Sequence, residues 1–145
     1  MKITILDPSP GEEEVIIVKC RALDEETLRF INRFKAGSGR VTAYKDGSIV
    51  KLRTSDILYF ESVDERVFVY TDEDICEVKT RLYELEKELP DIDFMRAGKS
   101  LIINLSHVKS LSPAFSGRFE ALMTNGEKVV ISRQYVPVLK EKLGL

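Results

Sequence analysis

The chain has 145 residues, of which 43% are hydrophobic and 32% are charged, and it contains one histidine and two cysteines. This length and composition predict one ordinary folded domain with at most a small appendage, and they exclude a disordered chain and a His-rich or Cys/His metal site. The net charge of −2 conceals a polarity, because residues 37–94 carry a net −6 and residues 95–145 carry a net +5.

The first 36 residues predict a small strand-strand-helix unit. Ile3 and Ile5 alternate with polar residues, a Pro-Ser-Pro-Gly break follows, and residues 15–20 have the composition of a second strand. Asp24 is a candidate N-cap for a helix with apolar residues at three-residue spacing, namely Leu28, Ile31 and Phe34. Residues 35–39 indicate a linker, so we place a domain boundary there. No apolar run reaches the roughly 20 residues of a membrane helix, and the N-terminus has no secretory-signal pattern.

Hairpin signals dominate from Arg40 onward. Asp46-Gly47 and Asn125-Gly126 are typical two-residue turns between β-rich runs. An apolar stripe formed by Val78, Leu82, Leu85 and Leu89 predicts a helix that Pro90 ends, and a short helix is expected near residues 135–143. The predicted strands are residues 41–44, 49–52, 57–61, 66–71, 75–78, 101–103, 108–111, 115–123 and 128–131. The fold class is therefore mainly β with minor α, with about eight to ten short strands.

Carboxylates are the candidates for catalysis, because the usual phosphate-binding and nucleophile motifs are absent from the sequence. Asp72 with Asp74, or Asp91 with Asp93, would place paired carboxylates in turns, an arrangement that can serve a hydrolase or hold a divalent cation. Exposed acidic turns are common, so we predict no enzyme activity and no cofactor. The single histidine, His107, is expected to make an ordinary hydrogen bond beside a strand.

The basic end of the chain offers a different chemistry. Residues 94–104 place Arg96, Lys99 and Ser100 in a Gly-containing loop followed by a short apolar strand, and residues 131–134 repeat this plan with Arg133. A rigid sheet could thus project these side chains into a nucleic-acid groove, where Arg suits guanine and Lys or Ser suits phosphate. Two ordinary solvated loops, or a β-rich interaction module that binds an acidic protein partner, would account for the same pattern.

Several motifs in residues 40–145 together resemble the LytTR family of bacterial DNA-binding domains. They are the run DILYFES at 56–62, the helix LYELE at 82–86, the segment FMRAGKS at 94–100 with Ile103 and Asn104, and Ser132-Arg133 with Tyr135 and Leu139. The resemblance implies an elongated, mostly antiparallel fold of about ten short strands with a helix. Such a domain reads successive major grooves through loop residues, binds direct repeats and bends its site.

The resemblance also implies roles for individual residues. Arg133 is the expected base contact and Lys99 a second contact, while Ser100 and Arg96 would contact phosphate or position the loop. Arg66 lies near a third contact loop, and Asn104 is expected to tie its loop through side-chain hydrogen bonds. Many relatives carry His where this chain has Gly98, a departure that concerns the fine specificity.

The short N-terminal unit implies a mode of regulation. The 36 residues before the LytTR-like region are too few for a receiver domain, so we expect no phosphorelay control. The chain is similar to stand-alone LytTR transcription regulators, which are cytoplasmic and in some cases restrained by a membrane-bound inhibitor protein. We expect the N-terminal unit to serve homodimer contact or inhibitor docking, because it is too small for a core of its own; simple packing on the main domain is the alternative.

Overall fold

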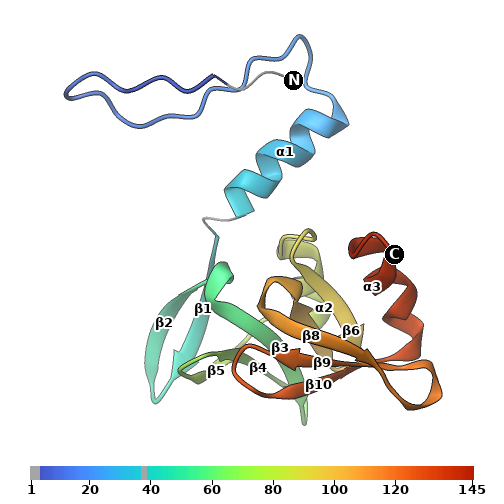
Figure 1. Cartoon of the computed structure of the whole chain (residues 1–145). Coiled ribbons are helices and arrows are strands. Elements are labelled where there is room, and N and C mark those ends of the chain that lie inside the picture. Colours follow the sequence, from blue (N-terminus) through green and yellow to red (C-terminus); the bar gives the residue numbers. More distant parts are fainter. Residues whose placement is uncertain (1–3, 37–38) are drawn as a thin grey trace.

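The computed structural model describes residues 4–36 and 39–145, which form ten strands and three α-helices (Figure 1). None of the described helices is long and apolar enough to cross a membrane. The elements in chain order are α1 (Glu25–Ala36), β1 (Arg40–Lys45), β2 (Ser48–Arg53), β3 (Ile57–Val63), β4 (Arg66–Thr71), β5 (Ile75–Val78), α2 (Leu82–Glu88), β6 (Phe94–Gly98), β7 (Leu101–Asn104), β8 (Val108–Pro113), β9 (Phe119–Met123), β10 (Lys128–Ile131) and α3 (Val136–Lys142).

The strands form two antiparallel sheets. The larger has seven strands in the order β2-β1-β5-β4-β3-β7-β6, and the smaller has three in the order β10-β9-β8. Tight turns join neighbouring strands: Asp46 and Gly47 between β1 and β2 both have positive φ, as do Asp64 and Glu65 between β3 and β4. Such turns match the twist of an antiparallel hairpin. The prediction of a mainly β fold with about ten short antiparallel strands is confirmed.

The larger sheet is covered on both faces, which explains its continuous apolar runs. Along β7, Ile102 faces one core while Leu101 and Ile103 face the other, since successive side chains of a strand point to opposite sides. The α2 core contains Phe60, Leu82 and Leu85 with the neighbouring buried residues Ala43, Ile57, Val67, Val69, Cys76, Val78, Leu89, Phe94 and Ile102. The α3 core contains Leu58, Tyr59, Met95, Ala97, Leu101, Ile103, Ala121, Met123, Val129, Ile131, Val136 and Leu139.

Two boundaries in this domain differ from the sequence prediction. Val78 belongs to β5 rather than to the helix, because its backbone pairs with Val67 of β4. The apolar stripe is still buried as one set, but helix α2 begins only at Leu82. The segment that we expected to be a loop from Phe94 to Ser100 is strand β6 as far as Gly98, because Phe94 and Met95 pair with β7 and bury their side chains in opposite cores.

The N-terminal unit is only partly as predicted. Helix α1 forms, and Asp24 caps it: the Asp24 carboxylate accepts a hydrogen bond from the Thr27 amide at 2.8 Å. The two expected strands are absent from residues 4–24, which contain neither helix nor strand. Val15, Ile16 and Ile17 are more than 60% exposed, and no strand among residues 4–36 and 39–145 pairs with them. Ile3, Gly37 and Ser38 lie outside the described residues.

Candidate nucleic-acid interface

A backbone hydrogen bond joins the two basic segments that the sequence singled out. The amide of Ser132 donates to the carbonyl of Ala97 at 2.8 Å. The turn between β6 and β7, which carries Lys99 and Ser100, therefore lies beside the segment that carries Arg133. Gly98 completes the contact, since a Cβ at this position would stand 3.2 Å from the Ser132 hydroxyl oxygen. Two segments more than 30 residues apart in sequence thus form one surface.

Internal hydrogen bonds hold the β6–β7 turn on both sides. The Arg96 guanidinium donates to the carbonyls of Gly98 at 2.7 Å and Lys99 at 2.6 Å, and to the Glu86 carboxylate of α2 at 3.1 Å. From the other side, the Ser62 amide of β3 donates to the Ser100 carbonyl at 2.8 Å. The Arg96 side chain is only 17% exposed, so all its described contacts are internal and fix the turn from behind.

Arg133 opens a short 3₁₀ turn directly after β10 and is exposed. Its aliphatic stem lies on Gly117, where a Cβ would be 3.0 Å from the Arg133 Cδ. No hydrogen bond or ion pair engages the side chain of Arg133 or of Lys99 within the part of the chain that the structure describes. Both cations are therefore available to an external acceptor.

Gly117 belongs to a third segment, which the sequence analysis did not identify. We predicted one strand over residues 115–123, but strand β9 begins at Phe119 and residues Phe115–Gly117 form a 3₁₀ turn. The Ser116-Gly117 pair is a turn signal that the apparent alternation concealed. We call Lys99–Ser100, Phe115–Arg118 and Ser132–Arg133 together the basic turn cluster; its basic residues are Lys99, Arg118 and Arg133, and none of its residues is acidic.

Arg66 lies in the strand that follows the β3–β4 turn, next to the basic turn cluster, but its guanidinium is paired with a carboxylate. The Ser62–Ser100 hydrogen bond brings the end of the β3–β4 hairpin next to the basic turn cluster. The Arg66 guanidinium donates to both carboxylate oxygens of Glu77, at 3.0 and 2.6 Å, and lies 5.3 Å from the centre of the Phe68 ring. This pairing lowers the pKa of Glu77, so the carboxylate stays charged and competes for Arg66. Arg66 is thus less available than Arg133 or Lys99.

Two polar residues outside the basic turn cluster have structural roles. The Asn104 side chain is completely buried; its amide donates to the Ile57 carbonyl at 2.8 Å, and its oxygen accepts from the Ser106 amide at 3.0 Å and hydroxyl at 2.6 Å. Asn104 thus has the expected structural role, but it ties the turn Leu105–His107 to the start of β3 and not the Lys99–Ser100 turn. His107 Nε2 lies 2.5 Å from the Ser55 carbonyl, an acceptor, so this nitrogen carries the proton. The expected ordinary hydrogen bond is therefore present.

The acidic turns do not assemble a catalytic site. The Asp74 carboxylate forms an ion pair with Lys45 across the β1–β5 pair. No group of three His, Cys, Asp or Glu side chains is arranged to hold a metal ion in residues 4–36 and 39–145.

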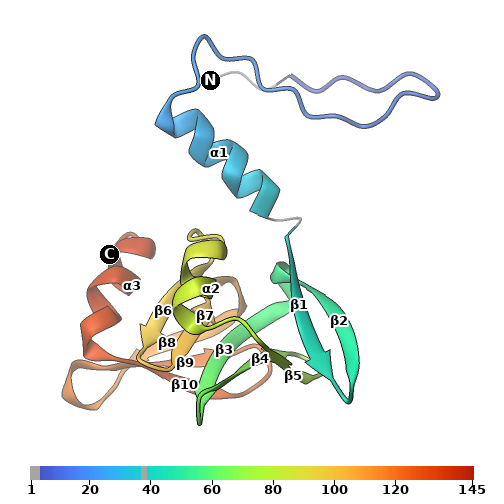
Figure 2. The ribbon, with the colours of Figure 1, turned by 180° about the vertical axis from the view of Figure 1, so that it is seen from behind.

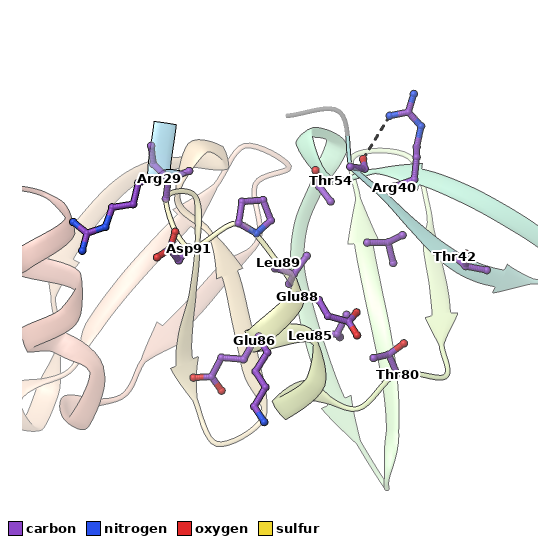
Figure 3. Close-up of a pocket in the computed structure, with 15 residues that line it drawn as sticks. Arg29, Arg40, Thr42, Thr54, Thr80, Leu85, Glu86, Glu88, Leu89 and Asp91 are labelled. Atoms are coloured by element: carbon purple, nitrogen blue, oxygen red, sulfur yellow. Dashed lines mark hydrogen bonds between the residues drawn. The ribbon is translucent and has the colours of Figure 1, made fainter. Parts of the chain in front are cut away.

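Asp91 lines a groove of about 1090 Å³ between α2 and the start of β1, to which Arg29 of α1 also contributes (Figure 3). The floor of this groove includes Leu85 and Leu89, and its rim carries scattered charges rather than a convergent set.

The two ends of the domain are therefore distinct. The groove lies at the end near α1, whereas the β3–β4 and β8–β9 turns lie at the far end in both views (Figures 1 and 2). The interface candidates thus gather where turns, and not helices, project from the sheets.

Comparison with known protein families identifies the family of this domain. Residues 47–144 match the LytTr DNA-binding domain. The chain belongs to the LytTR family. A solved LytTr DNA-binding domain from Bacillus cereus superposes with a TM-score of 0.71 at 30% sequence identity, covering 75% of this chain and all of that domain.

Curated relatives extend the LytTR match. The sensory transduction protein LytT of Bacillus subtilis is 31% identical over 139 residues, which cover 94% of this chain and 58% of LytT. LytT of Bacillus cereus is 38% identical over 98 residues, 68% of this chain and 40% of that protein. The chain thus spans about half the length of these LytT proteins. An uncharacterized HTH-type transcriptional regulator of Staphylococcus aureus strain MSSA476 is 26% identical over 147 residues, covering 100% of this chain and 99% of the relative.

The LytTR fold seen here does not use a helix-turn-helix. Strands separate α1, α2 and α3 from one another in the described chain, so no α-helix follows another directly. A helix-turn-helix needs two successive helices joined by a short turn. If this LytTR domain reads DNA, it must do so with other elements.

Proposed function

We propose that this protein is a bacterial transcription regulator that binds specific DNA sites through the basic turn cluster. The observation that carries this proposal is the Ser132–Ala97 hydrogen bond, which makes one surface of Lys99, Ser100 and Arg133. Membership of the LytTR DNA-binding family supports the same function. Such a role places the protein in the cytoplasm, where it meets chromosomal DNA.

Arg133 and Lys99 have different parts in this proposal. Arg133 reads a guanine in the major groove, because its guanidinium forms a planar fork that matches the O6 and N7 acceptors. Lys99 and Ser100 contact phosphate or a neighbouring base edge from the β6–β7 turn. Arg66 makes a further contact only when it exchanges Glu77 for a phosphate.

Arg96 acts as a positioning residue rather than a DNA contact. Each of its three guanidinium nitrogens already donates a hydrogen bond, to the Gly98 carbonyl, the Lys99 carbonyl or the Glu86 carboxylate. It therefore presents Lys99 and Ser100 at a fixed place, and it lowers the conformational freedom that would otherwise be lost on DNA binding.

The test is selection of bound fragments from a genomic DNA pool, followed by titration of the selected and a scrambled duplex at several salt concentrations. We expect at least a thousandfold preference for the selected duplex and a logarithmic affinity that falls with logarithmic salt by about 0.9 per phosphate contact. Equal binding to both duplexes would instead favour the interaction module that grips an acidic protein partner.

We further propose that the N-terminal unit of residues 1–36 forms a homodimer, so that two copies engage direct-repeat sites. In residues 4–31, large apolar side chains lie exposed, and none of the residues of that stretch belongs to either core. Pairing with the same segment of a second copy would supply the missing strand partners and cover these side chains. Helix α1 begins with Glu25 and Glu26 and ends with basic residues, so an antiparallel copy complements it in charge.

Deletion of residues 1–36 should convert a dimer into a monomer that still folds, because both cores consist of residues 43–139. Mass measurement by light scattering and the far-ultraviolet spectrum would check both expectations. The dimer proposal fails if the full chain is already a monomer. If regulation in cells nevertheless depends on residues 1–36, the partner that covers their apolar side chains is a membrane-bound inhibitor protein.

A further inference from the structure

Phe115 is the most exposed large apolar side chain of the described residues, at 89% exposure. The backbone holds it there: Ser116 and Gly117 both have left-handed φ, at 61° and 73°, and the Ala114 amide closes the loop with a 2.8 Å hydrogen bond to the Arg118 carbonyl. Left-handed backbone at a non-glycine residue costs free energy, so the surrounding fold must hold this turn in one defined conformation.

The position of this turn indicates which bound molecule Phe115 contacts. Gly117 supports the stem of Arg133, and Phe115 lies two residues away in the same 3₁₀ turn. The turn that carries Phe115 and the side chain of Arg133 are therefore neighbours on the surface of the domain. Arg118 on the other side of the turn is exposed and adds positive charge.

The chemistry of the phenyl ring narrows the target. Phe has no hydrogen-bond donor or acceptor, so it gains little from a phosphate or from the polar edges of G, C or A. The C5-methyl group of thymine is the apolar feature that a major groove displays, and Phe is one of the side chains that contact it.

On the basis of the proposed DNA-binding function, we propose that Phe115 contacts a thymine methyl group next to the base pair that Arg133 reads. The β8–β9 turn is then a third reading element beside the β6–β7 turn and the segment after β10. Its selectivity comes from shape and apolar contact, whereas that of Arg133 comes from hydrogen bonds.

The test uses the full chain and its selected duplex, with each thymine in turn replaced by deoxyuridine, which lacks the methyl group and keeps the base pair. We expect one replacement, beside the position where Arg133→Ala relaxes preference, to weaken binding about fourfold, the loss for one methyl group. Phe115→Ala should weaken binding to the thymine duplex about four- to tenfold. This variant should bind the thymine duplex and the duplex with that deoxyuridine replacement with equal affinity. Phe115→Leu should keep part of the effect.

Ile49→Ala is the matched control, because Ile49 is a 69% exposed apolar residue of β2 outside the basic turn cluster, and it should leave every affinity unchanged. If Phe115→Ala binds like the unaltered chain, or loses the same factor with every duplex, Phe115 does not contact a thymine methyl and the inference is overturned. If the unaltered chain does not distinguish selected from scrambled DNA, the proposed function itself fails, which is a different result.

Discussion

Arg133→Ala is expected to lower the affinity for the selected DNA site by about 1–3 kcal/mol, roughly 5- to 150-fold. The loss should appear mainly as relaxed preference at one base pair, because a bidentate contact to guanine discriminates against the other bases. Binding to scrambled DNA should change little. Arg133→Lys should not restore the preference, since an ammonium lacks the planar fork. Titration of the site and of its single-base variants measures each of these effects.

Two further variants distinguish the loss of a positive charge from the loss of a base contact. Lys99→Ala should weaken binding to all duplexes alike and reduce the salt slope by about one, if Lys99 contacts phosphate. Arg53→Ala, an exposed arginine of β2 outside the basic turn cluster, removes the same charge as Arg133→Ala and should leave base preference intact. Equal effects of Arg133→Ala and Arg53→Ala would assign the base contact to another residue.

Asn104→Ala is expected to destabilise the fold by about 2–4 kcal/mol, because it removes three hydrogen bonds and leaves buried polar groups without partners. The side chain joins the beginning of β3 to the 3₁₀ turn after β7, so the loss affects both cores. Denaturant unfolding of the variant, with the slope checked against the unaltered chain, gives this difference.

Asn125→Ala provides the comparison for Asn104. Asn125 is exposed in the β9–β10 turn, where its side-chain oxygen accepts from the Glu127 amide at 3.0 Å. This change should cost at most about 1 kcal/mol, since water replaces the lost bond. A loss at Asn104 no greater than that at Asn125 would refute the role of the buried amide.

The hairpins of this protein could be predicted because their signals are local. The Asp46-Gly47 turn, the two strands that flank it and the Asp24 cap each depend on residues within a few positions, and all are present. The strands expected around Ile5 and Val15 are absent from the described residues 4–24, because β propensity alone supplies no pairing partner. The same limit hid strand β6, whose Gly and basic residues resemble a loop until β7 pairs with it.

The residues of the candidate interface could be predicted from the sequence, but the internal contacts of its arginines could not. Lys99, Ser100 and Arg133 do lie on one exposed surface. Arg96 differs from Arg133 only through its distant partners: Glu86 comes from another element, and the carbonyls of Gly98 and Lys99 become available only once the turn has folded. The pairing of Arg66 with Glu77 across neighbouring strands likewise depends on strand register, which residue types alone do not specify.

The separation of the turn tips from the two cores has an evolutionary consequence. Lys99, Ser100, Phe115 and Arg133 are exposed, whereas Ala97, whose carbonyl accepts the Ser132 amide, is buried. Exchanges at the tips should therefore change operator preference at little thermodynamic cost, so that duplicated copies of such a gene can acquire new target sites by a few substitutions without first acquiring a more stable scaffold.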